Sequence, residues 1–314
     1  VRQLAVATTT ATRSTSLRGS ETALQRLDLP RRLTFIAAGV VILLVLLLLA
    51  FITWNGVQIF FHSGVPLGNI LSSTWDPTDT PATFGILPFV AGTAGVTVVA
   101  AIISTPLSVG LAIFMAEIAP RWARSIAQPA MEVFVGIPSV VWGWLGLTIL
   151  VPWLRTNLHS VGFTLGFSWF AGSLVLSLMI LPTITSISYD VISTIPREMR
   201  TGSLALGSTR WQTIRHVVLP AAKTGLITAV VLGMMRAAGE ALAVQMVIGN
   251  RPLMPTSLTQ PLTTLTSQIT LDMGNTVSGE AWNEALWTMG LVLLIISFAF
   301  VLFVRWLARG GTAR

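Results

Sequence analysis

Six long apolar stretches constrain the fold of this chain more than any other feature of its sequence. They cover residues 34–54, 84–115, 126–154, 167–189, 224–248 and 285–304. About 20 apolar residues in a helix cross the roughly 30 Å of hydrocarbon in a bilayer, and each stretch reaches that length. Helices are expected because backbone groups in lipid must bond to one another. The pattern predicts an all-α, polytopic membrane helix bundle of about six transmembrane helices, with Pro138 as a kink in the third.

The low charge content excludes an ordinary soluble domain. Charged residues make up 10% of the 314 positions and apolar residues 53%, whereas about 25% charged residues is typical of soluble domains. With a mean hydropathy of +0.77, the chain has too little charged surface to cover an apolar core, so apolar faces must meet lipid. The chain has no cysteine, which excludes disulfides and thiolate metal sites.

The distribution of cationic residues predicts the orientation in the membrane. Sixteen of the 19 cations lie in the tails and loops of one side, two (Arg155 and Arg251) lie on the other side, and Arg236 lies within an apolar stretch. Cytoplasmic loops carry the excess of Lys and Arg, so both termini are expected in the cytoplasm. The cations form no groove-sized patch, which argues against nucleic acid as a partner.

The two ends of the chain are expected to lie outside the main bundle. Residues 1–33 are rich in Thr, Ser, Ala and Arg, and they predict a flexible cytoplasmic tail. Residues 34–84 would add one transmembrane helix and an outer loop. Residues 309–314 would form a short cytoplasmic tail.

The connection between the fourth and fifth apolar stretches predicts a short amphipathic helix. Pro196 favours a helix start directly after it, Gly207 is expected to end the helix, and Pro220 to open the next span. Four apolar residues are interspersed in this cationic segment: Met199, Leu204, Leu206 and Trp211. Such a helix is equally suited to lie on lipid headgroups or to dock into a groove of another protein.

The spacing within this connection resembles a motif of ABC-importer permeases of type 1. In that family, Glu-Ala-Ala is followed by a spaced Gly and an Ile-x-Leu-Pro, and the loop forms a coupling helix that docks on the ATPase subunit. Gly207, Val217, Leu219 and Pro220 match the later part, whereas Thr201, Gly202 and Ser203 stand where the family has Glu-Ala-Ala. The resemblance implies a permease core over residues 85–308, with a coupling loop at 190–223.

Three further stretches look most like the membrane subunits of the phosphate-specific importer. They are residues 87–93 (LPFVAGT), 136–143 (GIPSVVWG) and 236–250 (RAAGEALAVQMVIGN), and the last resembles the C-type of the two paralogous permeases. The resemblance implies a phosphate importer subunit in a prokaryotic plasma membrane. Its partners would be a paralogous permease, an ATPase dimer that binds ATP and Mg, and an extracytoplasmic phosphate-binding protein. Permeases for molybdate or sulfate, a secondary transporter without an ATPase and a structural scaffold remain as alternatives.

The sequence lacks the motifs of the common enzyme classes. There is no G-x-x-x-x-G-K-[ST] loop, because Ala222 precedes the single lysine, Lys223. Gly-x-Ser-x-Gly and His-Glu-x-x-His are also missing from the sequence. The chain is therefore expected to be no enzyme and to bind no cofactor itself.

Three charged residues within apolar stretches are the candidates for the substrate pathway. A charge at the bilayer centre costs about 2.5–3.5 kcal/mol on insertion scales, so such residues usually face the bundle interior or water. Arg236 and Glu240 are four residues apart, which places them on one face of a continuous helix. Arg236 suits a phosphate in transit because its planar fork matches phosphate oxygens; the alternative is a structural ion pair. Glu132 is either a third member of the pathway or an interfacial acid.

Overall fold

The computed structural model describes the backbone of residues 15–311 and the side chains of residues 31–306. The chain divides into two compact units, residues 1–54 and 55–314. Five helices among the described residues are long and apolar enough to cross a membrane, and a sixth span is formed if a bent pair of helices counts as one. This confirms the predicted all-α membrane bundle of about six spans.

The first unit contains the N-terminal part of helix α1 (Thr15–Phe61). Residues 15–33 are helical, although the sequence predicted a flexible tail through residue 33; residues 1–14 of that tail lie outside the described residues. The apolar side chains of residues 33–54 are largely exposed along the helix. A helix that is apolar all round is suited to lipid on every face.

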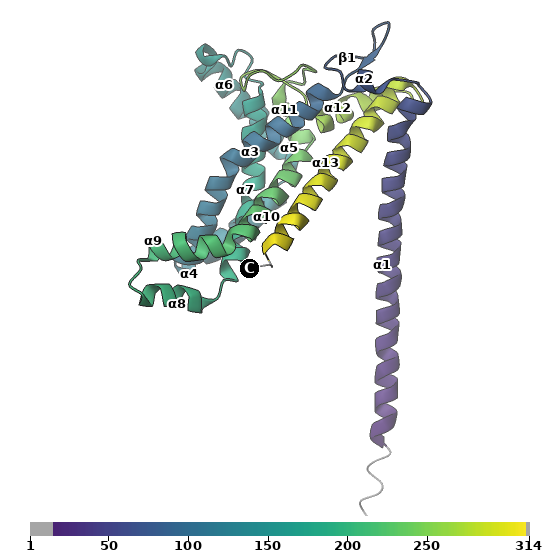
Figure 1. Ribbon diagram of the computed structural model, residues 1–314. Helices are drawn as coiled ribbons and strands as arrows, with labels where there is room; N and C mark the ends of the chain where they lie inside the picture. Colours follow the sequence, from purple (N-terminus) through teal and green to yellow (C-terminus); the bar gives the residue numbers. More distant parts are fainter. Residues whose placement is uncertain (1–14, 312–314) are drawn as a thin grey trace, which may run out of the picture. The chain divides into compact units, whose positions relative to one another are not determined.

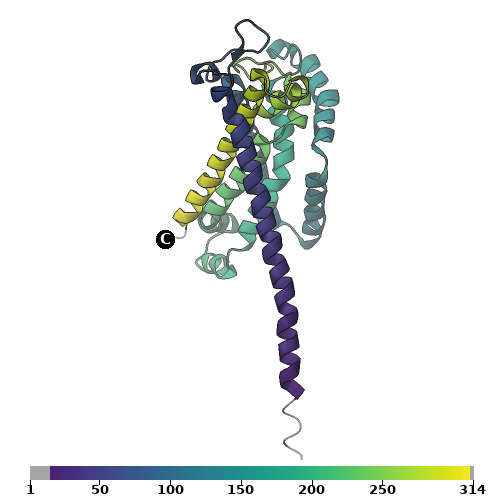
Figure 2. The same ribbon diagram turned by 90° about the vertical axis from the view of Figure 1, so that its right-hand side faces the viewer.

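Four long helices form the centre of the second unit: α3 (Leu87–Ile113), α7 (Trp169–Ser193), α10 (Leu219–Ala238) and α13 (Ala281–Gly311). α7 packs against both α3 and α10, and α10 also packs against α13 (Figures 1 and 2). The core between α3, α7 and α10 mixes Val and Ile with alanines such as Ala100 and Ala229. Small residues let membrane helices approach closely. A Cβ on Gly233 of α10 would lie 2.5 Å from Ile184 Cγ1 of α7.

The predicted third span, residues 126–154, is broken. α4 (Arg121–Gly136) ends before Pro138, and α5 (Ser139–Leu145), η2 (Gly146–Leu150) and α6 (Val151–Asn157) continue at an angle of 90° to it. Ile137 has the extended conformation, with φ −65° and ψ 124°. A residue before proline is disfavoured in the α conformation, so Pro138 causes a complete break where a kink was expected.

The predicted fifth span, residues 224–248, is also divided. The helical run starts earlier, with α9 (Arg210–Thr213) and η4 (Ile214–Val218), and it continues through α10 to Ala238. Pro220 therefore lies inside a helical run and does not open it. After α10 the chain leaves the helix, and α11 (Leu242–Ile248) follows as a separate short helix.

Each of three π-helical segments has a proline two residues after it. η1 (Phe114–Ile118) precedes Pro120, η2 precedes Pro152, and η4 precedes Pro220. Proline has no N–H, and its ring clashes with the carbonyl four residues earlier in a regular helix. That carbonyl belongs to the π segment in all three cases, and the wider π turn provides the room. Such segments are frequent at functional sites.

The short elements of the second unit gather at its two ends. One end carries α2 (Leu67–Ile70), the antiparallel strands β1 (Trp75–Asp76) and β2 (Thr83–Phe84), the 3-10 turns η3 (His159–Val161) and η5 (Met273–Asn275), and α12 (Leu265–Asp272). The other end, here called the α8 end, carries α8 (Arg197–Ala205) and α9 (Figure 1). At the first end, Glu284 is 2% exposed and lies 2.8 Å from His62 Nδ1 through its Oε1.

Candidate functional site

Arg236 lies in the last turn of α10 and reaches across to α7. Its Nη1 donates a hydrogen bond of 2.7 Å to the hydroxyl of Thr183. The side chain is half-buried, and the close approach at Gly233 holds the two helices together one turn earlier. The guanidinium is thus held between two transmembrane helices by a neutral partner.

Glu240 lies in the break between α10 and α11. Its Oε1 accepts a bond of 3.3 Å from the backbone N–H of Ala243, and its carbonyl oxygen accepts one of 2.7 Å from Thr266 Oγ1. The expectation that Arg236 and Glu240 share a helix face is wrong, because the helix ends between them at Ala238. Neither ion pair found among the described side chains joins Arg236 to Glu240.

Glu132 is exposed on α4 and lines a cavity of about 310 Å³ between α4 and α7. Gln128 lines the same cavity from α4, and Ser186 and Asp190 line it from α7. Thr183 and Ser186 are three residues apart on α7, so they lie on one face of that helix. The cavity is therefore next to the contact that holds Arg236. Thr183 and the α7 wall do not stand out in the sequence, since uncharged hydroxyls carry no signal in an apolar stretch.

The coupling-loop residues form a helix–turn–helix at the α8 end. α8 ends at Ala205, and Gly207 has a φ of +84°, which confirms its predicted role as the helix terminator. The Oγ of Ser203 and the Oγ1 of Thr213 lie 3.0 Å apart and join α8 to α9. Thr201 turns its hydroxyl back to the carbonyls of Arg197 and Glu198, 3.2 and 3.3 Å away.

The remaining motif positions differ in burial. Gly202 is exposed, with open space where a Cβ would stand, and Pro220 is exposed, whereas Val217 and Leu219 are half-buried. The four apolar side chains of the loop are exposed: Met199, Leu204, Leu206 and Trp211. Leu206 reaches 89% exposure. The other described residues of the chain leave these four side chains exposed.

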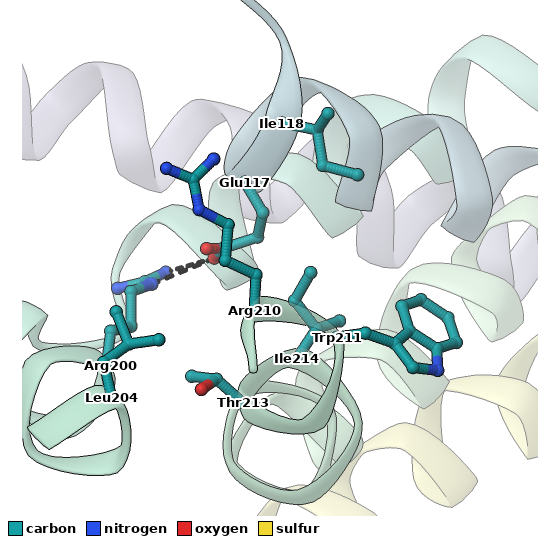
Figure 3. Close-up of a pocket in the computed structure, with 8 residues that line it drawn as sticks. All are labelled: Glu117, Ile118, Arg200, Leu204, Arg210, Trp211, Thr213 and Ile214. Atoms are coloured by element: carbon teal, nitrogen blue, oxygen red, sulfur yellow. Dashed lines mark hydrogen bonds and ion pairs between the residues drawn. The ribbon is translucent and has the colours of Figure 1, made fainter. Parts of the chain in front are cut away.

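A second cavity, of about 370 Å³, lies between the loop and the end of the second span (Figure 3). On one wall, Arg200 donates from Nε and Nη2 to Glu117 Oε1 of η1, at 2.9 and 2.7 Å. The same guanidinium donates to the carbonyls of Ile195 and Ile192, at 2.5 and 2.9 Å. The side chains of Arg200 and Glu117 are 19% and 13% exposed.

In the sequence, Arg200 stands out only as one of the loop cations. Two sequence signals could have pointed to this ion pair. Arg200 lies directly before Thr201, the first motif residue, and Glu117 is an acidic residue at the end of an apolar stretch. Their pairing depends on how η1 and α8 meet in space. No group of three His, Asp or Glu side chains that could hold a metal ion occurs within the described part of the chain.

The comparisons with known proteins show the family of the chain. Residues 108–310 match the family described as binding-protein-dependent transport system inner membrane component. A probable ABC transporter permease protein, YqgH of Bacillus subtilis, is 51% identical over 88% of this chain and 87% of that protein. The phosphate transport system permease protein PstC of Xylella fastidiosa is 34% identical over 87% of each chain.

Solved structures of ABC importers share the fold. The chain resembles a bacterial ABC transporter involved in the import of the acidic polysaccharide alginate, with a TM-score of 0.62, 16% identity and coverage of 91% of this chain and 98% of that chain. It also resembles the MetNI methionine ABC transporter in inward-facing conformations, with a TM-score of 0.51, 19% identity and coverage of 69% and 93%. The chain belongs to the binding-protein-dependent transport system inner membrane component family, as a multi-pass ABC-importer permease subunit.

Proposed function

We propose that this chain is the permease subunit of an ATP-driven inorganic phosphate importer. The observation that carries the proposal is the unused hydrogen-bonding capacity of Arg236. A guanidinium has five N–H donors, and the one bond found for it in the described residues goes to the neutral hydroxyl of Thr183. A charge held between helices with a neutral partner is suited to bind an anion that passes through. The relatives named as phosphate transport permeases supply the identity of that anion.

In this proposal, the chain forms the pathway together with a paralogous permease. An extracytoplasmic binding protein delivers phosphate to the pathway. Arg236 binds phosphate oxygens, Glu240 lines the way at the break between α10 and α11, and Glu132 lines it in the α4–α7 cavity. Phosphate then leaves toward the α8 end.

The exposed apolar side chains of α8 and of the turn after it are suited to dock on a separate ATPase dimer, which would bind ATP and Mg. Thr201 stands where the family has an acidic residue, and its hydroxyl is used within α8. Docking at this position therefore depends on the apolar side chains Met199, Leu204 and Leu206 rather than on a salt bridge.

Phosphate uptake by cells that carry Arg236→Gln tests the role of the arginine. Hydrogen bonds to charged groups contribute about 1.5–3 kcal/mol, so we expect uptake to fall roughly 10- to 100-fold while the subunit still assembles. Arg251→Gln, which removes an exposed-loop cation of the opposite end, is the matched control. Wild-type uptake by the assembled Arg236→Gln variant would refute the assigned role.

Competition separates phosphate from other oxyanions. We expect unlabelled phosphate to suppress the uptake of labelled phosphate, and equal concentrations of molybdate or sulfate to leave it unchanged. Suppression by molybdate or sulfate alone would identify a different oxyanion. Co-purification of an ATPase with this chain in mild detergent would decide against a secondary transporter.

The proposed orientation places both termini and α8 in the cytoplasm. Because the chain has no cysteine, single cysteines report accessibility without background from this chain. We expect a membrane-impermeant maleimide to label Val277→Cys, which is 63% exposed in the wild type, in intact cells. Leu206→Cys should react only after the membrane is opened, and the reverse pattern would invert the orientation.

A further inference from the structure

One side chain, Arg200, connects helix α8 to the second and fourth spans. The backbone neighbours of α8 are α9 and η4, and no residue of α8 is buried. Arg200 extends from this helix to Glu117 on η1 and to the carbonyls of Ile192 and Ile195 at the end of α7. Displacing α8 would therefore strain three charge-assisted bonds to η1 and α7, and a fourth to the linker at Ile195.

Three consecutive residues of η1 make three different connections. Glu117 pairs with Arg200 of α8. The carbonyl of Ala116, which Pro120 leaves without its helical N–H, accepts a bond of 3.0 Å from Arg124 Nη2 of α4. Met115 lines the cavity of Glu132. Within one turn, η1 therefore contacts helix α8, helix α4 and the cavity of Glu132.

The second target of Arg200 leads to the same cavity. Ile192 lies near the end of α7, and Ser186 and Asp190 on that helix line the cavity wall. Arg200 donates to this helix end, where a cation is also favoured by the helix dipole. Both the η1 wall and the α7 wall of the cavity are therefore attached to one guanidinium on α8.

We propose that Arg200 and Glu117 are positioning residues that transmit displacement of α8 to the walls of the Glu132 cavity. The proposal rests on the proposed function, since it assumes that an ATPase moves α8. Neither residue contacts the substrate; the pair makes α8, η1 and the end of α7 move as one body. Without the pair, α8 would shift on α9 and η4 while the cavity stays as it is.

The test measures the cavity directly. Ser186 is exposed in the cavity wall, and Ser186→Cys would be the single cysteine of the chain. In the reconstituted complex of both permeases with the ATPase, the labelling rate of this cysteine by a water-soluble maleimide is compared with and without a non-hydrolysable ATP analogue. We expect the nucleotide to change the rate at least 5-fold when Arg200 and Glu117 are present.

Adding Arg200→Gln or Glu117→Ala should reduce the nucleotide effect to less than 2-fold, and the double variant should be no worse than either single one. Non-additivity of this kind identifies residues that act as a unit. Arg121→Gln, which removes an exposed cation from the start of α4, should retain the full effect. The amount of ATPase that co-purifies shows that each complex is assembled.

A nucleotide effect that survives both Arg200→Gln and Glu117→Ala would overturn the proposal, as would a parent complex whose cysteine does not respond to nucleotide. If Arg200→Gln fails to assemble, Arg200→Lys replaces it: lysine keeps the charge but lacks the fork that reaches both targets, and full response in that variant would also overturn the proposal. A parent complex that responds to nucleotide but transports no phosphate would refute the proposed substrate alone.

Discussion

Arg200 and Arg236 are the same residue type in two regions of one bundle, and their surroundings are opposite. Arg200 donates four bonds, two to a carboxylate and two to helix-end carbonyls. Within the described part of the chain, Arg236 donates one, to the hydroxyl of a neighbouring helix. A guanidinium whose donors are used holds structure together, whereas one whose donors are unused is available to a ligand. The number of partners therefore separates a positioning role from a binding role better than residue type or depth does.

The largest expected difference between Arg200 and Arg236 is in the stability lost on substitution, which thermal unfolding of the purified chain measures. Arg200→Ala leaves Glu117 partly buried and unpaired, so we expect it to lower the free energy of unfolding by about 3 kcal/mol. Arg236→Gln loses a single bond but also removes a half-buried charge that has a neutral partner, so we expect a net loss of about 1 kcal/mol or less. Apparent melting temperatures measured in the same detergent provide the comparison. Equal losses of stability in the two variants would contradict the proposed difference between Arg200 and Arg236.

Overpacking where α7 and α10 approach closely is expected to cause the next largest loss of stability. Gly233→Ala would bring a methyl group within 2.5 Å of Ile184 Cγ1, and overpacking of this kind costs about 1–3 kcal/mol. We expect a lower melting temperature and weaker phosphate uptake, because the Arg236–Thr183 contact is one turn away. Gly290→Ala, with open space around the added methyl, is the control and should leave both measurements unchanged.

Removal of both Arg200 and Glu117 separates the contribution of the ion pair from that of the carbonyl bonds. In the Arg200→Ala and Glu117→Ala double variant no carboxylate is left without a partner, so we expect it to recover about 1–2 kcal/mol relative to Arg200→Ala alone. The same melting experiment measures this recovery. A double variant less stable than the single one would show that the carbonyl bonds, rather than the ion pair, dominate.

The smallest effect is expected at Thr183. Thr183→Val removes the hydroxyl that orients Arg236 and keeps the shape of the side chain, at a cost of about 1 kcal/mol. We expect the KM for phosphate uptake to rise severalfold and the maximal rate to change little. Ser173→Ala, at a buried hydroxyl whose bond stays within its own helix, serves as the control. An unchanged KM in Thr183→Val would show that Arg236 needs no such support.

The candidate site was predictable in its members but not in its arrangement. Arg236, Glu240 and Glu132 stood out because charges are rare in apolar stretches. The pairing of Arg236 with Glu240 was inferred from a continuous helix, and the break after Ala238 separates them. Gly239 marked a possible break, but glycine is common in membrane helices, so the sequence alone did not distinguish a packed glycine from a helix end.

The sequence by itself determined that the chain is a polytopic helical membrane protein, because apolar length and scarce charge admit few other structures. It also determined where α8 ends, since Gly207 takes a positive φ that other residues avoid. Only the tertiary structure decided where spans break, which helix receives Arg236, and that Arg200 meets Glu117 across 83 positions of the chain. The physical reason is range: helix length and turn conformation follow from neighbouring residues, whereas the partner of a buried charge depends on how distant helices pack.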